Sequence, residues 1–132
     1  MTQLFKKLGI GDVDEILILN EPDGFCAELD KLDKSITVRE SVIRTSEIDF
    51  ALIFITDVKQ IENRIQTVYT KLIGDAVVWF AFPSDTNKTK ISESEGWGVL
   101  GDYNLVQLDS TPINKDWIGV NFRKVEYINN AS

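Results

Sequence analysis

Hydrophobic residues along the chain fall into short runs separated by polar segments. Two runs are apolar almost throughout, Phe50–Thr56 (FALIFIT) and Ala76–Phe82 (AVVWFAF), and such runs are typical of strands covered on both faces of a sheet. A third run, Glu15–Asn20 (EILILN), predicts another strand. The alternating segment Ser35–Glu40 (SITVRE) predicts an edge or half-buried strand.

Three segments carry helical patterns. The clearest is Val58–Ile73, where the three-four spacing of apolar residues predicts one buried stripe and Gly74 falls where a C-terminal cap belongs. A short helix is expected at Phe25–Leu32, after the turn-forming residues Glu21-Pro22-Asp23-Gly24. A third helix is predicted to begin near Ser92. The stripe of the clearest helix consists of Val58, Ile61, Ile65, Val68, Leu72 and Ile73.

Two further strands, Leu105–Asp109 and Trp117–Val125, close the pattern. The link between them, Ser110 to Asp116, is too short for a crossover helix, so they should pair antiparallel. The alternation of strands and helices predicts one α/β domain over residues 1–132, a three-layer sandwich with a mostly parallel sheet of about six strands. The antiparallel pair should form a C-terminal hairpin at one edge.

The right-handed crossover rule also predicts the order of the strands. Glu15–Asn20 and Phe50–Thr56 should lie side by side at the centre of the sheet. Ser35–Glu40 should lie outside the first of them and Ala76–Phe82 beyond the second, with the hairpin at the far edge.

The composition excludes several classes of partner and of catalytic site. The net charge is −7 and the 14 basic residues form no dense stripe, so neither nucleic acid nor an anionic membrane surface is an expected partner. Histidine is absent and Cys26 is the single cysteine, which removes the usual metal sites and histidine catalysis. With neither a leader-like segment nor a long apolar run, a cytoplasmic protein is expected.

The segment Gly96–Gly101 (GWGVLG) matches the dinucleotide fingerprint G-x-G-x-x-G. That fingerprint needs a strand that runs directly into the glycines, whereas here the preceding strand is expected to end near Phe82. Ser92 and Glu95 spell a capping box that should start a helix before the first glycine, and Gly101 is expected to stop it. These glycines are therefore not expected to bind a cofactor.

The expected ligand position is the switch point between the first and third strands, beyond their carboxyl ends. The residues that would bind there are Asn20, Glu21, Asp23, Gly24, Phe25, Glu40 and Asp57, with Thr56 and Ser41 beside them. At the end of its strand, Glu40 could reach a ribose. The alternative is structural: Pro-Asp-Gly forms a turn and Asp57 caps the following helix.

Other clusters also allow two interpretations. Glu21, Asp23 and Asp57 could hold Mg²⁺ or serve acid–base chemistry, but no metal site is predicted from this common pattern. An aromatic–cation pocket could be built from Trp97, Trp117, Phe122 and Arg123; packing in the core is favoured instead. Trp79 is expected in the core, and the Cys26 thiol is expected to be buried and inert.

An ordered set of motifs gives the chain a family resemblance. The motifs are Leu8-Gly9, the turn Asn20-x-Pro22-x-Gly24-Phe25, and Trp117 followed by Phe122-Arg123, a pair inverted relative to the family pattern. With them, nearly the whole chain resembles a small bacterial family described as a domain of unknown function. This resemblance implies a fold and a bacterial source, and no activity.

More distantly, the expected strand order and terminal hairpin are similar to class I methyltransferases. Their loop after the first strand carries an acid and several glycines, whereas here it has one glycine and Pro22. The sequence therefore predicts a non-catalytic binding or interaction module. The alternative is a nucleotide- or S-adenosylmethionine-binding protein or a small-molecule enzyme, with its site at the carboxyl ends of strands one to three. The cofactor, the protein partner or small-molecule ligand, and the oligomeric state stay open.

Overall fold

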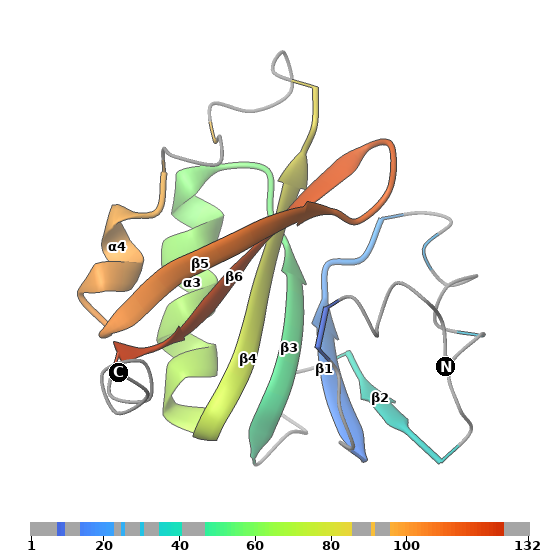
Figure 1. Cartoon of the computed structure of the whole chain (residues 1–132), viewed down its shortest axis with the longest axis vertical. Coiled ribbons are helices and arrows are strands. Elements are labelled where there is room, and N and C mark those ends of the chain that lie inside the picture. The colour runs from blue at the N-terminus through green and yellow to red at the C-terminus, as the bar shows by residue number, and fades with distance from the viewer. Residues whose placement is uncertain are drawn as a thin grey trace.

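A computed structural model of the protein describes residues 8–9, 14–22, 25, 30, 35–40, 47–85, 91 and 96–125. These residues form one six-stranded sheet with the order β2-β1-β3-β4-β6-β5 (Figure 1). The strands are β1 (Glu15–Leu19), β2 (Thr37–Arg39), β3 (Ile48–Phe54), β4 (Leu72–Pro83), β5 (Leu105–Pro112) and β6 (Trp117–Lys124). The helical elements are α3 (Val58–Val68), the 3-10 turn η1 (Tyr69–Lys71) and α4 (Gly98–Gly101).

The pairing of the strands confirms the order predicted from the sequence. β1 pairs in parallel with both β2 and β3, and β3 pairs in parallel with β4. β6 runs antiparallel to β4 and to β5, which forms the outer edge. The fold is thus an α/β sheet of mostly parallel strands closed by a C-terminal antiparallel hairpin.

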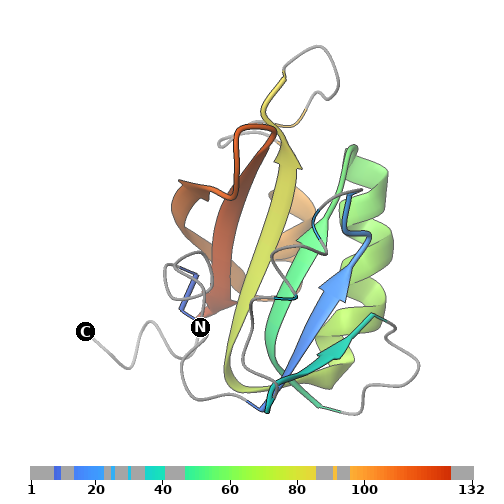
Figure 2. The same ribbon diagram turned by 90° about the vertical axis from the view of Figure 1, so that its right-hand side faces the viewer.

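Each face of the sheet carries a cluster of buried side chains, and we call the two faces the first and second face. α3 and α4 lie together on the first face, behind the sheet in Figure 1 and beside it in Figure 2. Because side chains alternate along a strand, β3 sends Ala51 and Ile53 to the first face and Leu52 and Phe54 to the second. On the second face Leu8 belongs to the same buried cluster as Leu52 and Phe54.

The helix predicted for Val58–Ile73 is shorter than expected. α3 ends at Val68, and after η1 the chain enters β4, where Leu72 pairs with Ile48 of β3. Sheet pairing therefore replaces the last helical turn. Gly74 has φ of +52° and lies within β4, so its prediction as a helix cap was wrong. Ile73, with 38% of its surface exposed, does not extend the buried stripe.

The segment around the glycine fingerprint also differs from the prediction. α4 begins at Gly98, after the first glycine, because Gly96 has φ of +105°, a conformation that no α-helix contains. Gly101 is the last helical residue, as expected. Ser92 and Glu95 lie outside the described residues. β4 ends at Pro83, and among the described residues no strand runs directly into the glycines.

Trp97 holds this short helix on the first face of the sheet. The residue is the N-cap of α4, and its ring is buried against Phe80, Phe82 and Phe122, with centroid distances of 6.0, 5.9 and 5.3 Å. Four helical residues give little stability of their own. The aromatic cluster is therefore what places α4, in agreement with the predicted packing role of Trp97.

Candidate functional site

The switch point predicted from the sequence lies between β1 and β3. The connection after β1 leads to β2 on one side of the pair, whereas the connection after β3 leads to β4 on the other. Because these strands are parallel, their carboxyl ends meet at one edge of the sheet, at the top of Figure 1. Asn20, Glu40 and Thr56 lie at or just beyond those ends.

Asn20 joins three elements at this edge. Its φ of +58° is a left-handed conformation, which asparagine tolerates better than most residues. The Nδ2 group donates to the Phe54 carbonyl at 3.4 Å, across from β1 to β3. The Oδ1 atom accepts from Nη2 of Arg64 on α3 at 2.9 Å. The Asn20 side chain thus fixes the end of β1 against β3 and α3.

The sequence did not point to Arg64 as part of this edge. Its position in the polar half of α3 is typical of a solvated side chain, and only the fold brings it to Asn20. The sequence did offer one signal for its position, the spacing from Gln60. Residues four apart lie one helical turn apart, so Arg64 and Gln60 share a side of α3. Arg64 places a permanent positive charge near the carboxyl ends of the strands.

Asp57 serves as the N-cap of α3. Its Oδ1 accepts from the Gln60 backbone N–H at 2.9 Å, and Gln60 Oε1 accepts from the Thr56 backbone N–H at 2.7 Å. This reciprocal arrangement resembles a capping box. It matches the structural alternative that the sequence left open for Asp57, and a ligand-binding role for this residue stays a prediction.

Phe25 lies in the core of the second face. Its side chain is only 3% exposed, and its ring meets Phe54 edge to face at a centroid distance of 4.9 Å. The Phe25 N–H donates to the Pro22 carbonyl at 3.1 Å, the spacing of a β-turn. Asp23, Gly24 and Ser41, which the sequence also placed at the site, lie outside the described residues, as does Cys26.

Glu21 and Glu40 bring two carboxyl groups together beside the switch point. Partial burial raises the pKa of Glu21, and the nearby Glu40 carboxyl raises it further. A hydrogen bond to the Glu21 backbone acts in the opposite direction and only partly offsets this. A neighbouring carboxylate disfavours the ionised form of Glu21 because like charges repel. Glu40 is exposed and Glu21 is half-buried, so a ligand can reach this pair of carboxyl groups.

The aromatic–cation pocket, which the sequence allowed but did not favour, does not form. Trp97 and Phe122 lie on the first face, whereas Trp117 packs on the second face, with its ring 5.1 Å from that of Phe54. Arg123 follows Phe122 on β6 and so points to the opposite side. Within the described ranges, no group of three potential ligands could hold a metal ion, and no helix there is long and apolar enough to cross a membrane.

Comparison with solved structures identifies proteins of the same fold. Phosphoethanolamine N-methyltransferase 2 of Haemonchus contortus, solved with phosphomonomethylethanolamine and S-adenosylhomocysteine, matches with a TM-score of 0.61 and 17% identity over 92% of this chain. The match covers 36% of that protein, so the chain spans about a third of its length.

Two matched proteins are closer to this chain in size. A SAM-dependent methyltransferase from Aquifex aeolicus has a TM-score of 0.60 at 14% identity, over 91% of this chain and 87% of that one. The N-methyltransferase NodS from Bradyrhizobium japonicum WM9 has a TM-score of 0.55 at 14% identity, over 92% of both chains. The core is therefore methyltransferase-like, as the more distant resemblance implied.

No protein-family model and no curated protein matches the chain. The expected membership of a small bacterial family and a bacterial source stay predictions.

Proposed function

We propose that this protein binds S-adenosylmethionine, or a closely related adenosyl compound, beyond the carboxyl ends of β1 and β2. The observation that carries the proposal is the Glu21–Glu40 carboxyl pair beside the switch point. The likeness to methyltransferases, one of them solved with S-adenosylhomocysteine, supports an adenosyl ligand. It favours this alternative over the non-catalytic module that the sequence first suggested.

The chemistry of the pair suits a ribose. Carboxylate oxygens accept hydrogen bonds from vicinal hydroxyl groups, as acidic residues near strand ends do in nucleotide-binding folds. Glu40 is exposed directly after β2, and Glu21 is half-buried after β1. A ribose between them would replace the unfavourable contact of two carboxyl groups with two acceptor–hydroxyl contacts. Binding is therefore expected to favour the ionised form of Glu21.

Asn20 supports this site indirectly. Its amide is held by the Phe54 carbonyl and Arg64, so the backbone that leads into Glu21 starts from a fixed position. We assign Asn20 a positioning role and Glu40 direct contact with the ligand. Pro22 contributes no backbone donor to this loop, so more of the recognition falls to the carboxyl groups.

Isothermal titration calorimetry with S-adenosylmethionine and S-adenosylhomocysteine tests the proposal. We expect saturable binding to the wild-type chain that weakens about tenfold or more in Glu40→Gln, because loss of one charged hydrogen-bond acceptor removes about 1.5–3 kcal/mol. Glu62→Gln is the matched control, since Glu62 is an exposed glutamate on α3. NAD and ATP serve as comparison ligands.

Two outcomes would contradict the proposal: absence of binding to both adenosyl compounds, or equal affinity of Glu40→Gln and the wild type. Incubation of the bound complex with a pool of candidate acceptors and methyl-labelled S-adenosylmethionine then measures methyl transfer separately from binding.

A further inference from the structure

A pocket on the first face of the sheet lies away from the carboxyl edge, and the adenosyl proposal does not use it. Its volume is about 190 Å³. Because η1 leads directly into the start of β4, the pocket lies at the opposite end of β4 from the carboxyl edge (Figure 1). The residues that line it come from η1, from the link between α4 and β5, and from the end of β6: Tyr69, Tyr103, Asn104, Lys124 and Val125.

Two tyrosine rings and a backbone bridge shape this pocket. Tyr69 and Tyr103 are partly buried and pack against the apolar cluster of the first face. Their ring centroids are 5.1 Å apart, with the planes tilted by 58°. The Val125 N–H donates to the Asn104 carbonyl at 2.8 Å, which ties the end of β6 to the start of β5. A ligand would therefore meet walls that are largely preformed, which lowers the entropic cost of binding.

Lys124 brings a positive charge to the pocket. It is half-buried and lies on the same side of β6 as Phe122, two residues away. Its ammonium group has three N–H donors and gives one of them to the Leu72 carbonyl at 3.1 Å. Within the part of the chain that the structure describes, no carboxylate pairs with this ammonium group. Since a partly buried charge is less screened than an exposed one, Lys124 favours an anion in the pocket.

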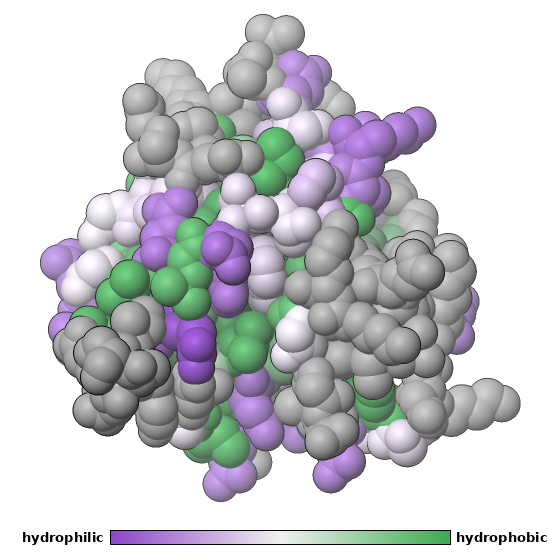
Figure 3. Space-filling model, viewed as in Figure 1, coloured by the Kyte–Doolittle hydropathy of each residue, from purple (hydrophilic) through white to green (hydrophobic). Residues whose placement is uncertain are grey.

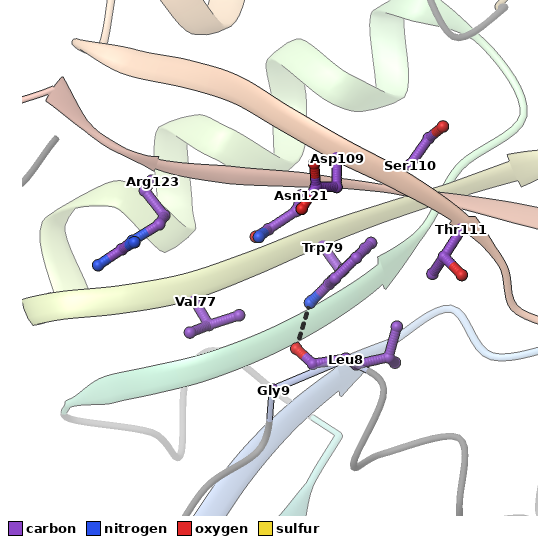
Figure 4. A pocket seen from close by; sticks show the side chains of 9 residues that line it. All are labelled: Leu8, Gly9, Val77, Trp79, Asp109, Ser110, Thr111, Asn121 and Arg123. Atoms are coloured by element: carbon purple, nitrogen blue, oxygen red, sulfur yellow. Dashed lines mark hydrogen bonds between the residues drawn. The ribbon is translucent and has the colours of Figure 1, made fainter.

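A larger pocket on the second face shows why the position of Lys124 is informative. That pocket, of about 530 Å³, lies over Trp79, whose indole Nε1–H donates to the Leu8 carbonyl (Figure 4). Its cation is Arg123, which already has an interaction partner within the protein. Lys124 follows Arg123 on β6 and points to the other face, where its partner is a neutral carbonyl. Of these two cations, Lys124 is the one whose charge a ligand could neutralise.

The other polar groups of the first-face pocket can all donate hydrogen bonds. The hydroxyls of Tyr69 and Tyr103 and the side-chain amide of Asn104 make no hydrogen bond to any described residue. Each hydroxyl can donate once, and the amide carries two N–H donors. Together with the ammonium group, these donors match an oxyanion, whose oxygen atoms accept several hydrogen bonds. A cationic ligand would be repelled by Lys124, and an apolar one would desolvate its charge without compensation.

We propose that this pocket binds the oxyanion of a small acid, either a phosphate or a carboxylate group. Lys124 Nζ would pair with the anion, while the Asn104 amide and the two tyrosine hydroxyls would donate to its remaining oxygen positions. Pockets for drug-sized ligands typically have about 300–1,000 Å³. This pocket is smaller, so it suits a small anion or the acidic end of a longer molecule.

Nuclear magnetic resonance of the full chain tests the proposal without any adenosyl compound. Inorganic phosphate and acetate are titrated separately at millimolar concentration, with sodium chloride holding the ionic strength constant. The backbone N–H resonances of Asn104 and Val125 report on the pocket. We expect at least one of the two anions to shift both resonances saturably, whereas chloride alone does not. The ratio of the two affinities shows whether the pocket prefers phosphate or carboxylate.

Variants locate the effect. Lys124→Gln removes the charge but keeps an N–H donor for the Leu72 carbonyl, and it should weaken binding about tenfold or more. Tyr103→Phe keeps the ring against Tyr69 and removes one donor, so it should weaken binding about threefold or more. Lys115→Gln is the matched control, because it removes an exposed lysine charge at the turn between β5 and β6, and it should change nothing.

Two results would overturn the proposal: neither phosphate nor acetate shifts the two resonances saturably, or Lys124→Gln binds the anion as tightly as the wild type. Should Lys124→Gln fail to fold, Tyr103→Phe decides, and an unchanged affinity of that variant contradicts the proposal. Because the titration contains no adenosyl compound, its failure would leave the carboxyl-edge proposal intact.

Discussion

The two faces of the sheet are built from the same strands and have different characters. On the first face, β4 and β6 contribute Phe80 and Phe122, which α3 and α4 cover together with the Trp97 ring. On the second face, the alternate residues of β6 are Asn121 and Arg123, which line a pocket. In Figure 3, which views the second face, hydrophilic and hydrophobic side chains are interspersed among the described residues.

The difference shows how a single strand can serve two purposes. Because side chains alternate with a period of two, one residue of β6 can complete a sealed core while its neighbour remains available to a ligand. At β6, stability should therefore depend chiefly on the side chains that point to the first face.

The largest expected difference in unfolding free energy is between substitutions at two neighbouring residues of β6. Phe122→Ala should lower the free energy of unfolding by about 3–5 kcal/mol, because Phe122 is 1% exposed and contacts two aromatic rings. Asn121→Leu should cost less than about 1 kcal/mol or be stabilising, since it removes an unpartnered acceptor. Chemical denaturation measures both. Equal losses would show that the two faces do not differ.

A substitution at Gly119 tests how tightly the second face is packed near Trp79. A Cβ atom there would come within 2.8 Å of Ile113 Cδ1 and 3.1 Å of Trp79 Cε3. Gly119→Ala should therefore cost about 1–3 kcal/mol in a thermal or denaturant melt. Adding Ile113→Ala should recover part of the steric cost in a double-mutant cycle. Gly98→Ala, where the Cβ would meet nothing within 4 Å, is the control.

Substitutions of Asp57 test how much its N-cap stabilises α3, the helix that lies on the first face. Asp57→Ala removes the cap of α3 and should lower the free energy of unfolding by about 1 kcal/mol, whereas Asp57→Ser should retain most of it. Denaturation combined with the adenosyl titration distinguishes capping from ligand contact. If Asp57→Ser abolishes binding while remaining fully stable, Asp57 contacts the ligand as well.

The smallest expected effect is the contribution of Glu21 to the pH dependence of stability. Its folded-state pKa lies above the ordinary value of 4.5, so its contribution to stability is greatest below pH 4.5 and is lost as pH rises through the raised pKa. Glu21→Gln should flatten the stability profile in that window and slightly stabilise the protein at neutral pH. Melting temperatures from pH 4 to 8 measure this, and an unchanged profile would contradict it.

Much of the sheet could be predicted because its signals are local. Continuous apolar runs identified β3 and β4, and the short link before Trp117 required an antiparallel pair. Gly74 was misassigned because the pairing of Leu72 with Ile48 is a long-range contact, which outweighs helical periodicity. The role of Phe25 in the core depends likewise on Phe54, which is distant in sequence.

The site was only partly accessible from the sequence. Topology rules placed Asn20 and Glu40 at one edge, because parallel strands share their carboxyl ends. The contact of Arg64 with Asn20 requires the packing of α3, and the Asn121 pocket requires the register of β5 against β6. For Arg64 the sequence offers only its helical phase, and for the pocket it offers no pattern at all.

The register shift in β5 has a consequence for solubility. β5 is the outer strand of the sheet, and a regular edge offers its backbone groups to the strand of another molecule. The irregularity between Gln107 and Ser110 interrupts that edge, and the charge of Asp109 lies within it. Edge-to-edge stacking into fibrils would have to bury this carboxylate. The irregularity that brings Asp109 to the pocket thus also protects the protein against aggregation.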